Sequence, residues 1–449
     1  MESEIEKTSI HSDLFDKIQF QKQLDLIKNA SDLAQSKIDW DSAHDDNIIR
    51  AIEVVEDFLR KKHRLCYGGQ AINAHLPSKY KFYDPKTTVP DYDFFTPQQD
   101  QDITALVKDL RKAGFQDITA REGMHEGTTK IYVDYIPVAD MTAIDPKLYK
   151  ILSKRESIFD GISYLDPNSL RMLMYLELSR PRGEVGRWSK VYERLALLNE
   201  FAPIKQCKKT KELFQDSLNV EQTQFTMNYI IKNERIFAGA DLVDLYEKSF
   251  GSKKSMKWIL KSAKPILFFS NQSNADAEQI CDEFNILNNS KSTSYHVKTL
   301  SSKGVDLIPS LKIVCQGKIP LVFIIDETAC HSYVTVSLTT KQILKIASMD
   351  TLITLYFGLA LIDSSYFDMG SMECLANQLV ELNMKARFKL NKFAFPFISL
   401  DCIGHQSSLP SLIRAKVKRM TNRKAELKSL LKLTNQSNKT IKQKKSNKK

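Results

Sequence analysis

Apolar residues recur along this chain with two different periods, so both helices and strands are expected. Residues 43–62 show helical spacing, with these apolar positions on one side: Ile48, Ile52, Val55 and Leu59. A short apolar strand follows at Leu65-Cys66-Tyr67, a break at Gly68-Gly69, and a second helix from Gln70 to Leu76. Strand, glycine break and helix in this order predict an α/β unit.

A second α/β pattern begins after residue 250, and Gly251-Ser252-Lys253-Lys254-Ser255 marks the boundary. Strands are expected at residues 265–269, 318–325 and 333–336, and helices at residues 275–284 and 344–362. The adjacent pair Asp326-Glu327 would point to opposite faces of a strand. We therefore expect no second active site in this half.

The chain is long enough for two or three domains, and the patterns predict four parts. An N-terminal helical arm (residues 1–45) precedes a first α/β domain with following helices (46–250), a second α/β domain without an active site (251–413) and a basic tail (414–449). In the arm, a helix is expected over Asp13–Ala34 from the spacing of Leu14, Ile18, Leu24 and Ile27, with Trp40 docking it. Lys208-Lys209-Thr210-Lys211 is expected to be an exposed loop.

Composition agrees with a globular chain and narrows the class of protein. Of 449 residues, 42% are hydrophobic, and no run of about 18 apolar residues predicts a membrane span. Residues 1–6 are acidic and lack a signal-peptide core. The seven cysteines include no C-x-x-C pair, which argues against a disulfide framework or zinc ribbon and for a reducing compartment. His331, beside Cys330, is interpreted as a strand residue and not as a metal ligand.

The net charge of +11 is concentrated at the C-terminal end. From Arg414 onward there are fourteen Lys and Arg against one acidic residue, Glu426, which leaves a net charge of −2 for the rest of the chain. Residues 414–431 still contain leucines and can form a basic helix, whereas residues 434–449 are low-complexity and expected to be disordered. Such a tail attracts polyanions through counterion release. The alternative is a solubilising or localisation tail without a role in the chemistry.

Two acidic residues and a glycine pair carry the chemical signal. Asp91 and Asp93 are two residues apart, so on a strand both side chains leave the same face. Carboxylates in this arrangement can share Mg²⁺, which also binds substrate phosphates. Gly68 and Gly69, between strand and helix, let backbone N–H groups approach a phosphate. Each feature alone is more often a surface pair or a plain turn, but together they suit an enzyme that handles a nucleoside triphosphate with metal ions.

Gly68-Gly69, the Asp91/Asp93 strand and a later single-Asp strand together resemble the nucleotidyltransferase superfamily that includes DNA polymerase β and the poly(A) polymerases. The insert from Pro77 to Pro90, with Lys81-Phe82-Tyr83-Asp84, is similar to the poly(A) polymerase catalytic subunits of large nucleocytoplasmic DNA viruses, of the poxvirus and mimivirus kind. The resemblance implies a polymerase β-like catalytic domain followed by a second, degenerate nucleotidyltransferase-like domain that serves structure and RNA binding. The stretch Phe393–Gly404 resembles the end of the same family.

A third carboxylate is expected on the strand segment of residues 130–142, which holds two candidates. Asp134 and Asp140 have the same parity, but Pro137 between them predicts an edge or a bulge, so parity does not decide. The sequence around Asp140 resembles the family's third-Asp motif, which favours Asp140. Asp134 is the alternative, with a solvated edge-strand carboxylate as its structural interpretation.

A basic stripe lies in the second stretch that resembles the viral family, residues 176–195. Arg187, Lys190 and Arg194 recur at helical spacing, beside an apolar stripe of Val191 and Leu195. This stripe can face a triphosphate or an RNA backbone, or it can be a solvated helix face with Trp188 as a core anchor. The resemblance favours nucleotide contact, so Gly68, Gly69, Arg187 and Lys190 are the expected nucleotide-binding residues.

The resemblance implies polynucleotide adenylyltransferase activity, which adds a poly(A) tail from ATP to an RNA 3′ end. Asp91, Asp93 and Asp140 would be the catalytic and metal-binding residues, with two Mg²⁺ or Mn²⁺ ions. Implied partners are ATP, RNA, and either a second copy or a separate processivity subunit, with a viral factory in the host cytoplasm, or the virion, as the location. Two alternatives stay open: an inactive RNA-binding or scaffold subunit, and a terminal transferase or second-messenger synthase that uses another nucleotide.

Overall fold

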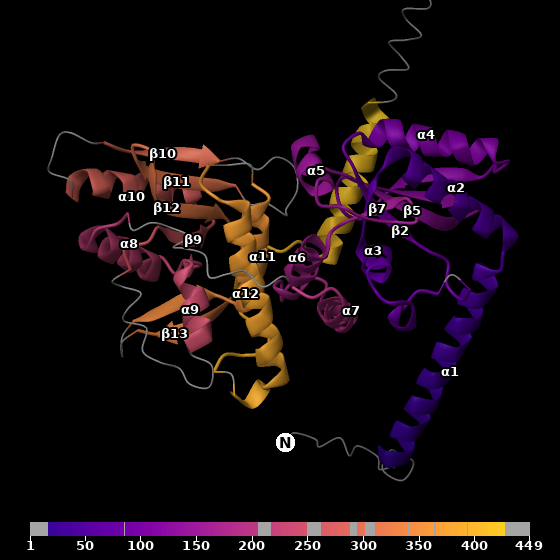
Figure 1. The fold of residues 1–449 in the computed structure, drawn as a ribbon, viewed down its shortest axis with the longest axis horizontal. Coiled ribbons are helices and arrows are strands. Elements are labelled where there is room, and N and C mark those ends of the chain that lie inside the picture. Colours follow the sequence, from indigo (N-terminus) through magenta and orange to yellow (C-terminus); the bar gives the residue numbers. More distant parts are fainter. Residues whose placement is uncertain are drawn as a thin grey trace, which may run out of the picture.

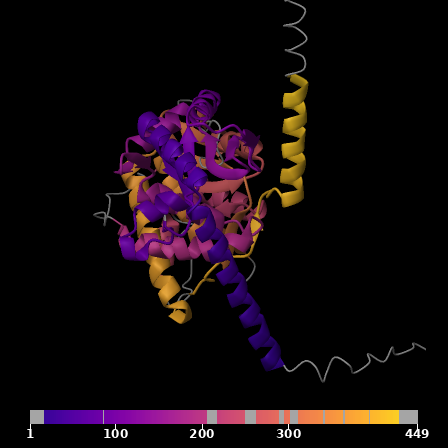
Figure 2. The same ribbon diagram turned by 90° about the vertical axis from the view of Figure 1, so that its right-hand side faces the viewer.

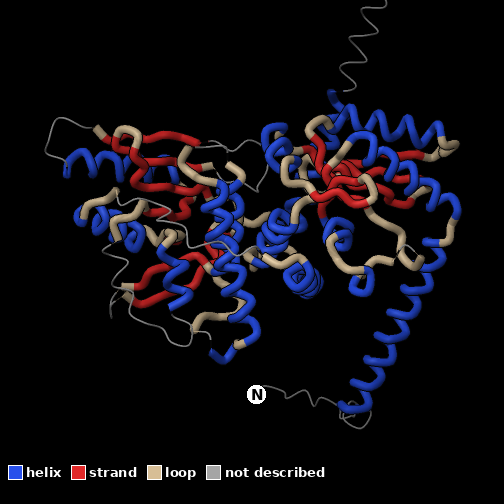
Figure 3. The backbone as a smooth tube through the Cα atoms, in the orientation of Figure 1, coloured by secondary structure: helices blue, strands red, loops and turns tan. Residues whose placement is uncertain are grey.

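The computed structural model describes residues 17–84, 86–204, 217–248, 262–287, 294–300, 310–338, 342–362, 365–392 and 394–426. Two α/β units lie side by side (Figure 1), and helices fill the space between their two sheets (Figure 3). The expected α/β class with two sheet-based domains is confirmed. No helix within these described ranges is long and apolar enough to cross a membrane.

The N-terminal arm is one long helix, α1 (Lys17–Ala43), which projects from the first unit (Figure 1). The helix continues past Ala34, where its spacing predicted an end, and residues 13–16 lie outside the described residues. The expectation that Trp40 docks the arm is wrong, because its side chain is 50% exposed and its ring stacks on His44. Leu24 and Ile27 are exposed too, since α1 extends away from the body of the unit.

The first sheet has seven strands in the order β3-β4-β5-β2-β1-β7-β6. In chain order they are β1 (Leu65–Tyr67), β2 (Tyr92–Thr96), β3 (Ile118–Glu122), β4 (Thr128–Val133), β5 (Ile136–Ala143), β6 (Ser157–Phe159) and β7 (Ile162–Tyr164). β5 is parallel to β2 and β7 is parallel to β1, while the other neighbours are antiparallel. Phe94 and Phe95 of β2 are buried in the core, as the sequence predicted.

Helices surround this sheet, and the first of them follows the hydrophobic pattern predicted for residues 43–62. α2 (Asp46–Lys62) is capped by the Asp45 side chain, and its four predicted apolar positions are buried. The helices that follow are α3 (Gly68–Ala74), the 3-10 turn η2 (Ser78–Tyr80), α4 (Gln99–Lys112), α5 (Pro146–Ser153), α6 (Pro167–Leu178), the 3-10 turn η3 (Val185–Arg187) and α7 (Trp188–Phe201). α3 begins directly at the end of β1, so the glycine pair forms the first turn of the helix.

The second sheet has eight strands in the order β10-β11-β12-β9-β8-β14-β13-β15. Its strands are β8 (Ile236–Phe237), β9 (Ile266–Ser270), β10 (Tyr295–Leu300), β11 (Leu311–Gln316), β12 (Ile319–Asp326), β13 (His331–Ser337), β14 (Ile343–Ala347) and β15 (Cys402–Ile403). The helices of this unit are α8 (Val220–Lys232), α9 (Asp241–Lys248), α10 (Ser273–Leu287), α11 (Met349–Ala360), α12 (Met369–Phe388) and the turn η5 (Leu390–Lys392).

The two units repeat one topology. Seven strands of the second sheet pair as their counterparts do in the first: β12 is parallel to β9 and β14 to β8, with antiparallel neighbours elsewhere. Chain order agrees as well, because α8-β8-α9-β9-α10-β10-β11-β12-β13-β14-α11 follows α2-β1-α3-β2-α4-β3-β4-β5-β6-β7-α6. Within the described residues, α5 lacks a counterpart, since residues 327–330 alone separate β12 from β13.

This repeat moves the domain boundary expected at residue 250. β8 pairs with β9 and β14, so α8, β8 and α9 belong to the second unit. The expected loop at 208–211 and the boundary at 251–255 lie outside the described residues. The helix predicted over residues 344–362 is partly wrong: residues 343–347 form β14, and α11 begins only after its cap, Ser348. The change from strand to helix falls at Ser348, and the apolar spacing of residues 344–362 did not reveal it.

The cysteines differ in part from the sequence expectation. Cys330, which precedes β13, forms a disulfide with Cys402 of β15, with 5.5 Å between the Cα atoms. The argument against disulfides from an odd, dispersed cysteine count is therefore wrong at this pair. His331 lies on β13, where it stacks on Phe269, and burial lowers its pKa to about 3. It is a strand residue in a packed core, as predicted.

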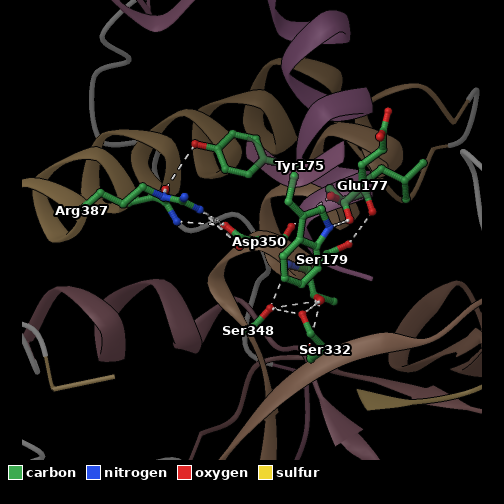
Figure 4. Close-up of polar contacts among 12 residues, drawn as sticks. Tyr175, Glu177, Ser179, Ser332, Ser348, Asp350 and Arg387 are labelled. Carbon is green, nitrogen blue, oxygen red and sulfur yellow. Dashed lines mark hydrogen bonds and ion pairs between the residues drawn. The ribbon is translucent and has the colours of Figure 1, made fainter. Parts of the chain in front are cut away.

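Polar contacts join the two units where α6 meets α11, α12 and β13 (Figure 4). Tyr175 of α6 donates to Asn383 of α12 at 3.5 Å, and the Ser332 N–H donates to the Ser179 carbonyl at 3.2 Å. Arg155 of the first unit forms an ion pair with Glu373 of the second. These contacts fix the second unit against the helices that follow the first sheet.

The described part of the basic C-terminal segment, residues 409–426, is a helix at the side of the molecule (Figure 2). It returns to the first unit, where Arg419 pairs with Glu122 and Arg423 lies 3.9 Å from Asp100. Some of its basic residues are therefore engaged with acidic groups, and the part of the tail predicted to be disordered lies outside the described residues.

Candidate active site

Asp93 and Asp140 lie side by side at the centre of the first sheet. β2 and β5 are parallel neighbours, and Asp93 is the register partner of Asp140. Register partners direct their side chains to the same face. Asp91 immediately precedes β2 and is exposed, Asp93 is half-buried, and Asp140 is 7% exposed. The sheet thus brings together the three carboxylates that the sequence singled out.

Asp134 lies apart from these three. It occupies the turn between β4 and β5 with a φ of 48° and an exposed side chain. The β4–β5 pairing shifts register between Ile131 and Tyr132, opposite Ala139 and Pro137, so the bulge predicted from Pro137 is present. The bulge breaks the parity between Asp134 and Asp140, and Asp140 is the one that faces Asp93.

Burial and neighbouring carboxylates raise the pKa values of Asp91 and Asp93. Burial and the charges of Asp91 and Asp140 raise the pKa of Asp93 to about 7, while Lys130 and Arg187 act in the opposite direction. Desolvation and Asp140 also raise the pKa of Asp91, again opposed by Lys130. The site therefore holds more negative charge than its neighbours neutralise, which is the condition that a bound cation relieves.

The donor set suits a hard divalent cation. Such ions take carboxylate oxygens, and Oδ1 of Asp140 is buried without a hydrogen-bond partner. As the side chains stand, however, no cluster of three or more His, Cys, Asp or Glu in the described ranges is arranged to hold a metal ion. The other oxygen of Asp140 is held in an ion pair by Lys130 of β4.

Gly68 is required by the position of Asp93. Its φ is +71°, and a Cβ built on it would lie 2.3 Å from Oδ2 of Asp93. A side chain at residue 68 would therefore strain the backbone and displace the carboxylate. Gly69 is crowded as well, because its Cβ would lie 2.8 Å from the Tyr83 ring and 2.9 Å from Arg194. The glycine pair lets the start of α3 pack directly on the carboxylates.

The insert between Pro77 and Pro90 is tied to the same place. The Asn73 side chain of α3 accepts from the backbone N–H groups of Phe82 and Tyr83 at 2.9 and 3.1 Å. Arg194 of α7 lies 4.6 Å from the Phe82 ring centre and donates to the Tyr83 hydroxyl at 2.6 Å. The family-like residues of the insert thus join α3 to α7 above the glycine pair.

The basic stripe lies at the start of α7, and part of it is paired with acidic groups. Arg187 forms ion pairs with Glu177 and Glu184 at 3.5 and 3.2 Å. Although burial lowers its pKa, these two glutamates and Asp93 raise it, so its charge reaches the candidate site. Lys190 is exposed, and desolvation, Arg194 and Arg187 lower its pKa.

The other face of this helix is structural. Val191 and Leu195 are buried, as predicted, and the Trp188 indole donates to the Glu177 carbonyl at 3.0 Å. Trp188 is therefore the core anchor that the alternative interpretation required.

The second unit carries no carboxylate at the equivalent positions. Tyr67 pairs with Asp93 in the first sheet, and the β8–β9 and β14–β8 pairings align Leu65 and Cys66 with Ile236 and Phe237. In that alignment Asp91, Asp93 and Asp140 correspond to Pro265, Leu267 and Phe323, of which Leu267 and Phe323 are fully buried. The expectation that this half has no active site agrees with this replacement.

A cavity of about 310 Å³ lies in the second unit, away from the carboxylates. Its polar lining is bonded internally: Arg387 donates to both oxygens of Asp350 at 3.0 and 3.3 Å (Figure 4). The guanidinium also lies 4.9 and 4.5 Å from the ring centres of Tyr192 and Phe397. These groups act on one another, so we place the candidate chemistry at the first sheet.

Lys130 and Tyr83 were missed as site residues by the sequence interpretation, which named Arg194 only as part of a stripe. Lys130 faces Asp140 because β4 and β5 form a hairpin. Pairing the residues of the two strands in sequence would have identified Lys130 as the partner of Asp140, provided that the position of the bulge was known. Tyr83 and Arg194 are 111 residues apart, and nothing in local spacing joins them.

Comparisons with known proteins match the part of the chain that contains these carboxylates. Residues 53–184, which include all three carboxylates, match the family model described as the poly(A) polymerase catalytic subunit. A protein of Acanthamoeba polyphaga mimivirus named as a poly(A) polymerase catalytic subunit is 26% identical over 234 residues, 49% of this chain and 39% of that protein. A protein of the same description from African swine fever virus (strain Badajoz 1971 Vero-adapted) is 28% identical over 160 residues, 34% of this chain and 33% of that protein.

The match therefore spans well under half the length of these curated relatives. The crystal structure of the Megavirus polyadenylate synthase has the same fold over most of the chain: the TM-score is 0.68 at 17% identity, with 95% of this chain and 86% of that chain covered. The resemblance to viral poly(A) polymerase catalytic subunits and the nucleotidyltransferase-type fold, both expected from the sequence, are confirmed.

Proposed function

We propose that this chain, which is similar to viral poly(A) polymerase catalytic subunits, is itself a template-independent polynucleotide adenylyltransferase. It would add adenylate residues from ATP to the 3′ end of viral mRNA. The observation that carries the proposal is the register pairing of Asp93 with Asp140 on neighbouring central strands. Asp91 immediately precedes the same strand as Asp93, and Gly68 packs on Asp93. A binding module has no need of three converging, mutually repelling carboxylates.

Each site residue has a proposed role. Asp91 and Asp93 would hold two divalent cations, Mg²⁺ or Mn²⁺, and Asp140 would share the one nearest the RNA 3′ end. Bound there, the cations would lower the pKa of the attacking 3′-hydroxyl and neutralise charge on the leaving pyrophosphate. The protein itself would position the reactants and supply fixed charge.

The nucleotide phosphates would lie between α3 and α7. Backbone N–H groups at Gly68 and Gly69 would face the triphosphate, since neither residue has a side chain to block the approach. Arg187, whose charge acts on Asp93, and Lys190 of α7 would contribute positive charge to the nucleotide site. Adenine preference is proposed from the resemblance alone.

RNA would be held by the basic C-terminal segment as well as by the site. The described helix of residues 409–426 exposes Arg414 and Lys418 beside the first unit, where a polyanion can approach. A second copy of the chain or a separate processivity subunit is the proposed protein partner, and the viral factory in the host cytoplasm, or the virion, is the proposed location.

One experiment tests the activity directly. The purified chain is incubated with a labelled oligoribonucleotide and each of the four nucleoside triphosphates separately, with Mg²⁺, with Mn²⁺ and with EDTA. We expect long tails with ATP and a divalent cation and no product with EDTA. Extension by UTP alone would identify a uridylyltransferase, and the absence of extension while oligonucleotide still binds would favour the scaffold alternative.

A further inference from the structure

Lys130 occupies the place where the third carboxylate would meet a cation. It is the register partner of Asp140 across the β4–β5 hairpin, and its Nζ is paired with Oδ2 of Asp140. The Asp140 side chain is 10% exposed and the Lys130 side chain is 36% exposed. The ion pair therefore joins a nearly buried carboxylate to a lysine side chain that is partly exposed to solvent.

Lys130 is paired with Asp140, whereas the other nearby cation, Arg187, is paired with residues outside the three carboxylates. Arg187 has its own acidic partners, Glu177 and Glu184, whereas Asp140 is the ion-pair partner of Lys130 within the described residues. One ammonium faces three carboxylates, and Oδ1 of Asp140 still has no partner. Lys130 is thus the cation paired with Asp140, while Arg187 acts on Asp93.

We propose that Lys130 is a resident cation that holds Asp140 in the metal-free protein and must leave it before a divalent ion can bind to that carboxylate. A lysine suits this exchange because its ammonium is a compact point charge on a flexible stem. The open side of the site gives that stem room to move away. The inference rests on the proposed function only in taking Asp140 as a metal ligand.

Two consequences follow for metal binding without nucleotide. Removing the ammonium removes a competitor for Asp140, so Lys130→Met should bind Mn²⁺ about tenfold more tightly than the unaltered protein. It also leaves the carboxylates unneutralised, so the metal should raise the melting temperature of Lys130→Met by more than that of the unaltered protein.

The test is a Mn²⁺ titration of the full chain, followed by the electron paramagnetic resonance signal of free Mn²⁺, with melting temperatures measured alongside. Lys130→Gln gives a second neutral variant if Lys130→Met does not fold, and Lys130→Arg keeps the charge and should stay near the original affinity. Lys147→Met, an exposed lysine of α5, is the matched control and should leave Mn²⁺ binding unchanged. Adding Asp140→Asn to Lys130→Met should abolish the gain.

The outcomes separate this inference from the proposed function. Equal or weaker Mn²⁺ binding by both neutral variants would overturn the role of Lys130, even in a chain that extends RNA. Tighter binding that depends on Asp140, in a chain that extends no RNA with any nucleotide, would support the role of Lys130 and contradict the polymerase proposal.

Discussion

The two α/β units share one strand order and one set of pairings, yet they differ at the three positions that carry the candidate chemistry. The first unit has Asp91, Asp93 and Asp140, and the second has Pro265, Leu267 and Phe323. Because the scaffold survives with either set, the carboxylates are not what holds the fold together. They are present at the cost of burial and mutual repulsion, which a purely structural unit avoids.

The junction of β1 and α3 in the first unit differs from its counterpart, the junction of β8 and α9, in the same sense. Gly68 has a positive φ and its missing Cβ makes room for Asp93. Its counterpart Gly239 has no such φ, and a Cβ there would meet the Phe237 ring at 2.5 Å. A glycine is therefore kept for an approach to a carboxylate in one unit and for apolar packing in the other.

The comparison is tested most strongly by removing a carboxylate from the first unit. Asp91→Ala or Asp93→Ala should lower RNA extension by about 1,000-fold, because charge in the transition state is left uncompensated. Asp326→Ala, at the end of β12 in the second unit, is the matched control and should stay within about twofold. Extension is measured at saturating Mg²⁺, with circular dichroism to verify folding. Near-normal activity of both first-unit variants would refute the site.

The third carboxylate is tested by a paired substitution on one hairpin. Asp140→Asn should be as damaging as the variants above, about 1,000-fold, because it faces Asp93 from the neighbouring strand. Asp134→Asn, in the exposed turn, should change extension by about twofold at most. A reversal of this order in the same assay would assign the third role to Asp134.

Placing the chemistry of one unit in the other should destabilise the fold. Leu267→Asp puts a carboxylate at the fully buried counterpart of Asp93, so we expect a loss of about 3–4 kcal/mol in unfolding free energy. Ile319→Asp, on the same sheet but 53% exposed, should cost about 1 kcal/mol or less. Urea unfolding measures both, and equal costs would mean that burial does not distinguish the units.

The destabilisation that the buried Asp93 carboxylate causes in the first unit should depend on pH. A folded pKa of about 7 for Asp93, above the ordinary value of an aspartate, means that its contribution to stability is greatest at low pH and is lost as the pH rises through 7. In EDTA, Asp93→Asn should therefore be more stable than the unaltered chain by about 1 kcal/mol or more at pH 8, with little difference at pH 4. Melting curves at both pH values decide it, and a gap that does not change with pH would contradict the shifted pKa.

The smallest expected effect concerns the basic tail, which belongs to neither of the two α/β units. Deleting residues 420–449 removes ten Lys and Arg along with Glu426. Oligonucleotide affinity should fall, tails should shorten, and the slope of log affinity against log salt should flatten, by about 0.7 per lost phosphate contact on a single strand. A tail of equal length with those ten residues changed to Gln should behave like the deletion. An unchanged slope would leave RNA binding to the folded units.

The sequence alone determined the local half of this picture. The strand that carries Asp93 and the apolar faces of α2 and α7 are set by periods of two and 3.6 residues, so short spacings were enough to predict them. The glycine pair, expected as a break before the helix, instead forms the first turn of α3, and Asp91 lies just before β2. The same reasoning failed at β14, because a short strand and the start of a helix can show similar apolar spacing. Trp40 defeated it too, since apolar spacing does not say whether a partner surface is present.

Tertiary structure alone decided which residues meet. Parallel pairing of β2 with β5 brings Asp140 to Asp93, a bulge turns Asp134 away, and the hairpin places Lys130 on the third carboxylate. The repeat of the two units was expected only from the family resemblance, which implied a degenerate second domain. Local spacing did not reveal it, because the repeat lies in the strand pairings. Strand pairing is made by backbone groups that every sequence carries, so register is settled by how whole sheets pack and not by any short motif.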